Sequence, residues 1–166
     1  MTLGIPTGLL LQIHVLISLV GIASGFVVLY GLLSRKPFGG WTALFLATTI
    51  LTSVTGFALP PFGFDPPRAV GLISLVLLVV AVAALYAFHL AGAWRSIYIG
   101  SALTALYLNV FVGVIQAFQK LPLLQSLAPT QSEPPFVVAQ VAVVATFVVL
   151  GVLAVMRFHP ALKPGT

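Results

Sequence analysis

The sequence predicts an all-α fold: a polytopic transmembrane bundle of five helices that forms a single domain over residues 1–166. Of these residues 60% are hydrophobic and 5% are charged, and the mean hydropathy is +1.20. Soluble globular proteins carry about 25% charged residues, so this chain has too little charge to cover a water-facing surface. Five apolar stretches also reach roughly the 20 residues that a helix needs to cross the hydrocarbon core.

The five expected spans follow one another along the chain, and none of them contains Asp, Glu, Lys or Arg. They cover about residues 8–33, 41–59, 69–91, 97–119 and 136–156. Charge, Pro and Gly break the chain at 34–40, and prolines break it at 60–68, because proline lacks an amide donor and clashes with the preceding turn. We expect a tight hairpin at 92–96, since one continuous helix would overshoot the bilayer. The longest connection, 120–135, is expected to be irregular because it contains four prolines.

The positive charges predict the orientation of the bundle. Five cations share the side of the C-terminus: Arg35, Lys36, Arg95, Arg157 and Lys163. The other side holds two cations and two acids: Arg68, Lys120, Asp65 and Glu133. Because cytoplasmic loops are enriched in Lys and Arg, we expect the N-terminus outside and the C-terminus in the cytoplasm. Trp41 and Trp94 fall at the expected cytoplasmic interface, where aromatic residues are enriched.

Composition also excludes several classes of function. The chain has no cysteine, and therefore no disulfide, thiolate metal site or thiol redox chemistry. Its pI near 10.1 reflects a shortage of acids rather than a basic patch, because the seven Lys and Arg are scattered along the chain. No nucleic-acid partner is expected, and the lipid bilayer is the expected surrounding.

Small and uncharged polar residues mark the span faces that meet other helices. In the first span His14, Ser18, Gly21 and Gly25 are spaced four, three and four residues apart and share one face. Gly21 and Gly25 form a GxxxG pair, which lets another helix approach closely. Similar stripes occur on three other spans: Thr48, Thr52 and Thr55; Ala105, Asn109, Gly113 and Gln116; and Gln140, Phe147 and Gly151. We expect three glycines to serve helix packing: Gly21, Gly25 and Gly113.

Several of these residues are expected to lie at a similar depth in the bilayer. At about 1.5 Å per residue, four of them lie roughly 7–12 Å outward of their span centres: His14, Thr55, Gln116 and Gln140. Asn109 lies near the midplane, and the cytoplasmic half has no equivalent cluster inside the bundle. The sequence therefore predicts a neutral polar pocket in the outer half of the bilayer, with these candidate residues: His14, Thr52, Thr55, Asn109, Gln116, Gln140 and Glu133.

A structural role is the alternative for these residues. Polar side chains join transmembrane helices by hydrogen bonds of about 0.6–2 kcal/mol each, and a threonine hydroxyl can satisfy itself on its own helix. For His14 and the three amides, ligand contact and helix–helix contact both remain open. Glu133, in the loop before the fifth span, can lie over the pocket or simply complement the positive end of that helix, an interaction of about 0.3–1 kcal/mol.

Several chemistries lack the residues that they need. A bis-histidine haem needs two histidines at equal depth on facing helices, and His14 has no such partner. His89 and His159 share a side of the membrane, but His159 lies beyond the last span, in a tail that we expect to be in water. There is no HExxH motif or carboxylate cluster for a metal, no acid near His14 for a Ser-His-Asp triad, and no intramembrane acid for ion-coupled transport. No metal, catalytic residue or haem is therefore expected.

Two functions fit what is left. The first is a non-enzymatic accessory or structural component that binds a partner in the membrane, within a larger complex or a homo-oligomer. The second is a quinone- or lipid-binding protein, with or without redox chemistry, that uses His14 and the amides of the fourth and fifth spans. An apolar pocket with a few convergent polar groups is what such a ligand needs.

Three segments resemble those of a group of small uncharacterised bacterial membrane proteins that have no known function. They are residues 108–112 (LNVFV), 116–120 (QAFQK) and 128–136 (APTQSEPPF), and the start of the second span at Trp41 fits the same resemblance. The resemblance covers most of the chain from Trp41 onward. It implies a protein of the bacterial cytoplasmic (inner) membrane, and it assigns no catalytic residue.

Overall fold

The computed structural model describes residues 6–36, 38–60 and 66–159, and over these residues it contains helices and no strands. Five helices are long and apolar enough to cross a membrane, which confirms the predicted helical class and the number of spans. They are α1 (Thr7–Leu33), α2 (Gly39–Phe57), α3 (Pro66–Val82), α4 (Trp94–Lys120) and α6 (Pro134–Arg157). A π-helical segment, η1 (Ala83–Ala87), continues α3, and the short helix α5 (Pro122–Leu127) lies between α4 and α6.

Prolines start three of the helices. Pro66, Pro122 and Pro134 are the first residues of α3, α5 and α6. Proline is favoured there because the first amides of a helix have no intrahelical acceptor. Two expectations are therefore corrected. Arg68 belongs to the first turn of α3 rather than to the preceding break, and the connection at 120–135 is not wholly irregular, because it contains α5.

The chain reverses between α3 and α4 in a tight turn. The third span ends at Ala87, four residues earlier than expected, and the turn follows at once. His89, Leu90 and Gly92 have φ angles of +48°, +59° and +53°, the left-handed conformation that turns the backbone sharply. The ring of Phe88 stacks on that of Trp94 with a centroid distance of 3.8 Å and joins the two sides of the turn.

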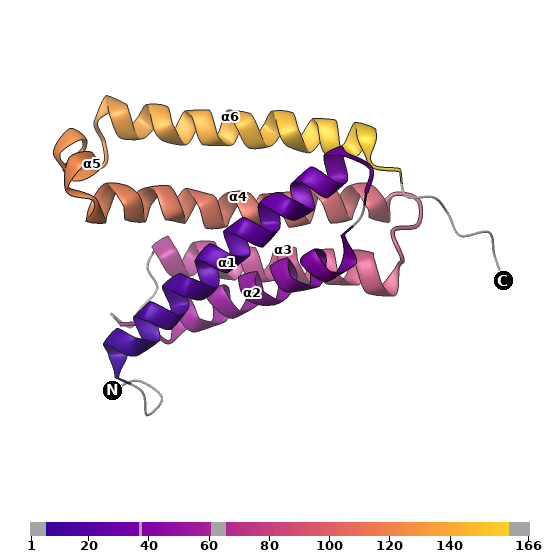
Figure 1. Ribbon diagram of the computed structural model, residues 1–166, viewed down its shortest axis with the longest axis horizontal. Helices are drawn as coiled ribbons and strands as arrows, with labels where there is room; N and C mark the ends of the chain where they lie inside the picture. Colours follow the sequence, from indigo (N-terminus) through magenta and orange to yellow (C-terminus); the bar gives the residue numbers. More distant parts are fainter. Residues whose placement is uncertain (1–5, 37, 61–65, 160–166) are drawn as a thin grey trace.

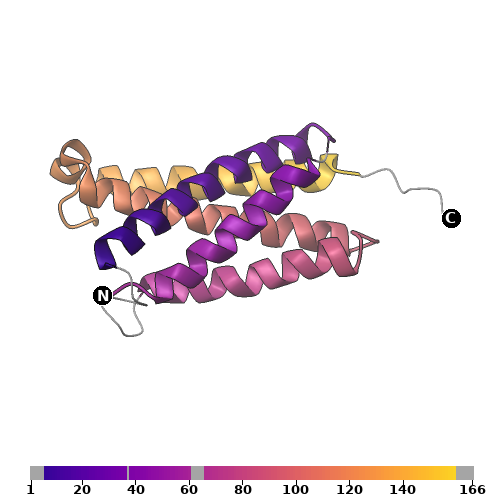
Figure 2. The ribbon, with the colours of Figure 1, turned by 60° about the horizontal axis from the view of Figure 1, so that its bottom comes forward.

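Helix α4 lies at the centre of the bundle. It contacts α1, α2, α3 and α6, while α1 packs chiefly on α2 and α2 also packs on α3. Figure 1 shows α4 and α6 side by side along the long axis, with α1 crossing them obliquely. Figure 2 shows α2 between α1 and α3. Helix α6 lies at the edge, where only Phe147 and Ala154 are buried.

The bundle has two ends, which we name after the ends of α4. The Trp94 end holds residues 34–36, the turn at 88–93 and the residues Phe158 and His159 after α6. The Lys120 end holds the start of α1, the end of α2, and α5. Four of the cations assigned to one side of the membrane lie at the Trp94 end: Arg35, Lys36, Arg95 and Arg157. Asp65 and Lys163, which also enter the charge argument, lie outside the described residues.

Two arginines bind backbone carbonyls at helix ends. Arg95 donates from Nη1 to the carbonyl oxygen of Phe158, and lies 3.4 Å from that of Val155. Arg68, which is buried, donates from Nη2 to the carbonyl oxygen of Leu59 at 2.6 Å. The last carbonyls of a helix have no intrahelical donor, so each arginine stabilises the end of one helix and ties it to another.

The buried apolar core lies in the half of the bundle nearer the Trp94 end. Its largest fully buried side chains include Phe45, Leu78, Ile99 and Leu106. Close approach of α1 makes this packing dense: a Cβ atom at Gly25 would overlap Leu106 and lie 3.0 Å from Phe45. Toward the Lys120 end the helix contacts become more polar, and the predicted pocket residues lie there.

Candidate functional site

His14 and Thr55, two of the predicted pocket residues, meet where α1 crosses α2. The Nδ1 atom of His14 lies 2.8 Å from Oγ1 of Thr55, and the same hydroxyl lies 2.7 Å from the carbonyl oxygen of Leu51. Because the threonine has one proton and donates it to Leu51, the histidine Nδ1–H is the donor in the first bond. That tautomer leaves Nε2 of His14 as an acceptor.

A second polar group, which we call the Asn109 layer, consists of Thr48, Thr49 and Asn109 around Gly21, together with Thr52, one turn after Thr48 on α2. A Cβ atom at Gly21 would lie 3.3 Å from Nδ2 of Asn109 and from the hydroxyls of Thr48 and Thr49. Thr48 bonds to its own helix, at 2.7 Å from the carbonyl oxygen of Leu44. Three other polar atoms are buried without a hydrogen-bond partner among the described residues: Nδ2 of Asn109 and Oγ1 of Thr49 and of Thr52.

The Asn109 layer therefore has unused hydrogen-bonding capacity where α1, α2 and α4 meet. Leaving a buried donor or acceptor unpaired costs about 1–3 kcal/mol. Asn109 and Thr52 are half-buried, and Thr49 is only 2% exposed. Two of the residues predicted to form a pocket, Asn109 and Thr52, lie in this layer, and each has a buried polar atom without a partner among the described residues.

The amides of Gln140 and Gln116 do not join this layer by any hydrogen bond of the described residues. Gln140, on α6, donates from Nε2 to the carbonyl oxygen of Phe111 at 3.3 Å, while its buried Oε1 has no partner. Gln116 is half-buried and makes no hydrogen bond with the described part of the chain. Gln140 therefore links α6 to α4 by a hydrogen bond, which is the structural alternative to ligand contact.

Glu133 organises the loop that precedes α6. Its carboxylate accepts from the amide and hydroxyl of Thr130, at 3.1 and 2.8 Å, and from the amide of Ser132, at 3.1 Å. Desolvation opposes the effect, but these hydrogen bonds prevail and lower the pKa of Glu133. The neighbouring Gln131 donates to the carbonyl oxygen of Ile115 at 3.2 Å and so holds the loop on α4.

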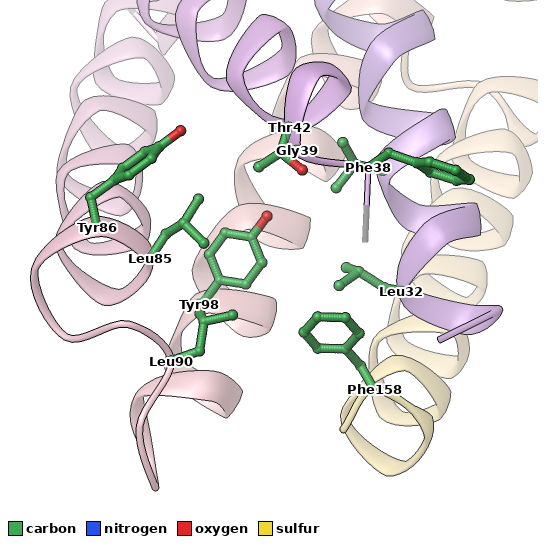
Figure 3. Close-up of a pocket in the computed structure, with 10 residues that line it drawn as sticks. Leu32, Phe38, Gly39, Thr42, Leu85, Tyr86, Leu90, Tyr98 and Phe158 are labelled. Carbon is green, nitrogen blue, oxygen red and sulfur yellow. The ribbon is translucent and has the colours of Figure 1, made fainter. Parts of the chain in front are cut away.

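A cavity of about 310 Å³ lies at the Trp94 end, in the half where the sequence analysis expected no polar cluster. Residues from α1, α2, η1, α4 and the chain after α6 line it (Figure 3). Thr42 and Tyr98 are buried on its wall, and the hydroxyl of Tyr98 points toward Thr42. Neither residue was among the predicted site residues.

A sequence signal for Tyr98 exists. Tyr98 and Ala102 continue the Ala105–Asn109 stripe of α4 toward the Trp94 end, at spacings of four, three and four residues. All residues at these positions up to Ala105 are buried. Tyr98 lies two helical turns before Ala105 on the same face of α4, so extending the stripe by two turns predicts that its side chain faces the bundle.

A groove of about 560 Å³ lies between α4 and α6 on the surface of the bundle. Gly100, Thr104 and Gly151 lie on its walls, with apolar residues such as Phe147 and Met156. A Cβ atom at Gly100 or at Gly151 would have no neighbour within 4 Å. The groove runs beside α6, a helix that the rest of the bundle covers only slightly.

The described residues contain no group of three His, Cys, Asp or Glu side chains close enough to hold a metal ion. Comparison with protein-family models, curated proteins and solved structures finds no match to this chain.

Proposed function

We propose that this chain is a non-enzymatic integral membrane protein that holds a transmembrane helix of a partner protein in the groove between α4 and α6. Five apolar helices support the membrane location. The residue set supports a role without catalysis, since Asp65 and Glu133 are the only acids of the chain and both lie outside the apolar stretches. The resemblance to bacterial proteins supports the cytoplasmic membrane as the location.

The proposed orientation puts the Trp94 end in the cytoplasm and the N-terminus outside. Arg35, Lys36, Arg95 and Arg157 lie at the Trp94 end, whereas Lys120 and the buried Arg68 lie at the other. Positive charge is enriched on the cytoplasmic side of membrane proteins. Trp41 and Trp94 begin their helices at the same end, where an aromatic belt would lie.

The glycines of the spans carry the proposal of a partner helix. Beyond the first turn of each helix, six glycines would place a Cβ atom against a neighbouring residue: Gly21, Gly25, Gly31, Gly56, Gly71 and Gly113. Gly100 and Gly151 have no such neighbour, and both line the α4–α6 groove. A glycine inside a helix costs about 0.5–1 kcal/mol relative to alanine, so packing within this chain does not explain the two.

Close approach of another backbone explains these glycines. Helices associate in membranes by van der Waals packing, and small residues let their backbones approach. Gly100 and Thr104 form a small-xxx-small pair on α4, and Gly151 faces the same groove from α6. A partner helix would fill the groove and cover part of the exposed apolar face of α6.

Photo-crosslinking in native membranes tests this proposal. With p-benzoylphenylalanine in place of Met156, an exposed residue that lines the groove, we expect one protein adduct, which Gly151→Leu abolishes by filling the groove. The same probe in place of Ala142, an exposed residue of α6 that does not line the groove, is the control and gives no such adduct. An adduct of two copies of this chain, or adducts with lipid alone, would overturn the assignment to a partner protein.

A second candidate function rests on the Asn109 layer. Its three unpaired polar atoms could hold a quinone or lipid carbonyl in the outer half of the bilayer, with Nε2 of His14 nearby on α1. On this candidate, Asn109→Leu and His14→Ala lower the amount of ligand that copurifies more than they lower stability. Unchanged ligand content in folded variants of both kinds would remove it.

A further inference from the structure

The cavity at the Trp94 end is separate from the α4–α6 groove, and the proposed function does not use it. From its walls we propose that the chain binds there the head group of a neutral, membrane-soluble carbonyl compound, a quinone by class. The site lies between α1, α2, η1 and α4. Binding in this cavity does not require the partner helix.

The size and walls of the cavity suit a flat ring. Its volume of about 310 Å³ lies at the lower end of the range of about 300–1,000 Å³ for small-molecule sites. Figure 3 shows the rings of Tyr98 and Phe158 among the lining residues, with Leu85 to one side of Tyr98 and Leu32 to the other. Aromatic and aliphatic side chains of this kind pack well against the faces and edges of another ring.

The hydroxyls of Tyr98 and Thr42 provide the polar end of the site. Tyr98 is 2% exposed and Thr42 is 9% exposed, so water does not satisfy them freely. Two hydroxyls have two protons, and even if one hydroxyl donates to the other, one O–H remains for a ligand. A carbonyl oxygen is an acceptor without a proton and therefore complements this remaining donor.

The charge of the lining selects a neutral ligand. Among the described residues that line the cavity there is no Asp, Glu, Lys, Arg or His. Arg35 and Lys36 lie at the same end of the bundle, but they are exposed and do not line it. Burying an anionic head group here would cost free energy with no cation to offset it, so phosphate- and carboxylate-bearing lipids are disfavoured.

The backbone around the cavity is irregular on one side. Leu85 and Tyr86 belong to the π-helical segment η1, and Leu90 has a left-handed φ of +59°. All three line the cavity. Single π-helical turns occur frequently at functional sites, and a left-handed φ is unfavourable for leucine. The fold maintains both irregular features where they shape this wall.

Quinone titration of the purified full-length chain in lipid nanodiscs tests the site. The probe is decylubiquinone, and the readout is quenching of the fluorescence of Trp41 and Trp94. We expect saturable quenching of the unmodified protein. Tyr98→Phe and Thr42→Val each remove a hydroxyl with little change in shape, and we expect each to raise Kd about three- to tenfold, as loss of one hydrogen bond predicts.

Tyr30→Phe is the matched control, because Tyr30 is an exposed tyrosine outside the cavity lining, and its Kd is expected to stay unchanged. Thermal unfolding of each variant establishes that it is folded, and with two hydroxyl variants the test does not depend on one of them. Quenching that rises without saturation, or equal Kd values in all variants, would overturn the proposal. A phospholipid or acylglycerol found by mass spectrometry in the unmodified protein, and lost in Tyr98→Phe, would overturn the quinone assignment in favour of an acyl-lipid carbonyl.

Discussion

The Nδ1 atom of His14 lies 2.8 Å from the Oγ1 atom of Thr55, so the only histidine inside the described α1 is hydrogen-bonded to α2. This contact lies toward the Lys120 end, where the apolar core is thinner. It thus supplies part of the specific contact between these two helices. It also fixes the imidazole ring in one orientation, with Nε2 as the acceptor that a ligand would meet.

The His14–Thr55 bond is expected to contribute measurably to stability. Thr55→Val removes the acceptor, and we expect a loss in the free energy of unfolding of about 0.6–2 kcal/mol, the range for interhelical hydrogen bonds in membranes. A double-mutant cycle with His14→Ala isolates the pairwise coupling. If the two substitutions change the free energy of unfolding additively, the bond contributes nothing to stability and the prediction is wrong.

We expect the loss of stability on Gly→Ala substitution at three positions to be larger where less space surrounds the glycine. At Gly25 a Cβ atom overlaps Leu106 and presses on Phe45, at Gly21 it meets polar atoms at 3.3 Å, and at Gly113 it lies 3.7 Å from the side chain of Ile22. Overpacking costs about 1–3 kcal/mol. We expect Gly25→Ala to destabilise most and Gly113→Ala to be neutral or stabilising, as measured by thermal unfolding in one detergent. The reverse order would contradict the close approach of α1.

Arg95 should hold the end of α6 on α4. Its guanidinium binds the carbonyl oxygens of Phe158 and Val155, and hydrogen bonds to charged groups contribute about 1.5–3 kcal/mol. We expect Arg95→Met to increase hydrogen exchange in the last turn of α6. Arg35→Met, which removes an exposed cation at the same end, is the control. Equal exchange in both variants would show that Arg95 does not anchor the helix.

The loop before α6 should loosen in acid. The folded pKa of Glu133 is lowered, so its hydrogen bonds stabilise the loop above the ordinary value of 4.5 and are lost as pH falls through the lowered pKa. We expect the amide resonances of Thr130 and Ser132 to titrate with a midpoint below 4.5. Glu133→Gln should remove the titration, and a midpoint above 4.5 would contradict the hydrogen-bonded geometry.

The number of spanning helices could be predicted from sequence because apolar length is a local property. The ends of the helices were harder to predict from sequence. Pro66 and Pro122 begin helices instead of only breaking them, and the π-helical η1 and left-handed Leu90 depend on how the turn packs against its neighbours. Local propensity does not encode those contacts, so the third span ends earlier than hydropathy alone indicates.

The candidate site was predictable only in part, because sequence supplies depth and helix face but not which helices adjoin. His14 and Thr55, at similar depth, do meet. Gln140 has a similar depth but bonds to the backbone of α4 at Phe111, because α6 lies at the edge of the bundle. Tyr98 was not among the predicted site residues, although it continues the stripe through Asn109 toward the Trp94 end.

Native mass spectrometry of the protein released gently from its own membranes is the sharpest test of the partner helix. We expect an assembly of the 17.4 kDa chain with one other membrane protein, which Gly151→Leu dissociates and Ala142→Leu leaves intact. Recovery of the chain alone with lipids, or of assemblies that survive Gly151→Leu, would contradict the assignment of the α4–α6 groove to a partner helix.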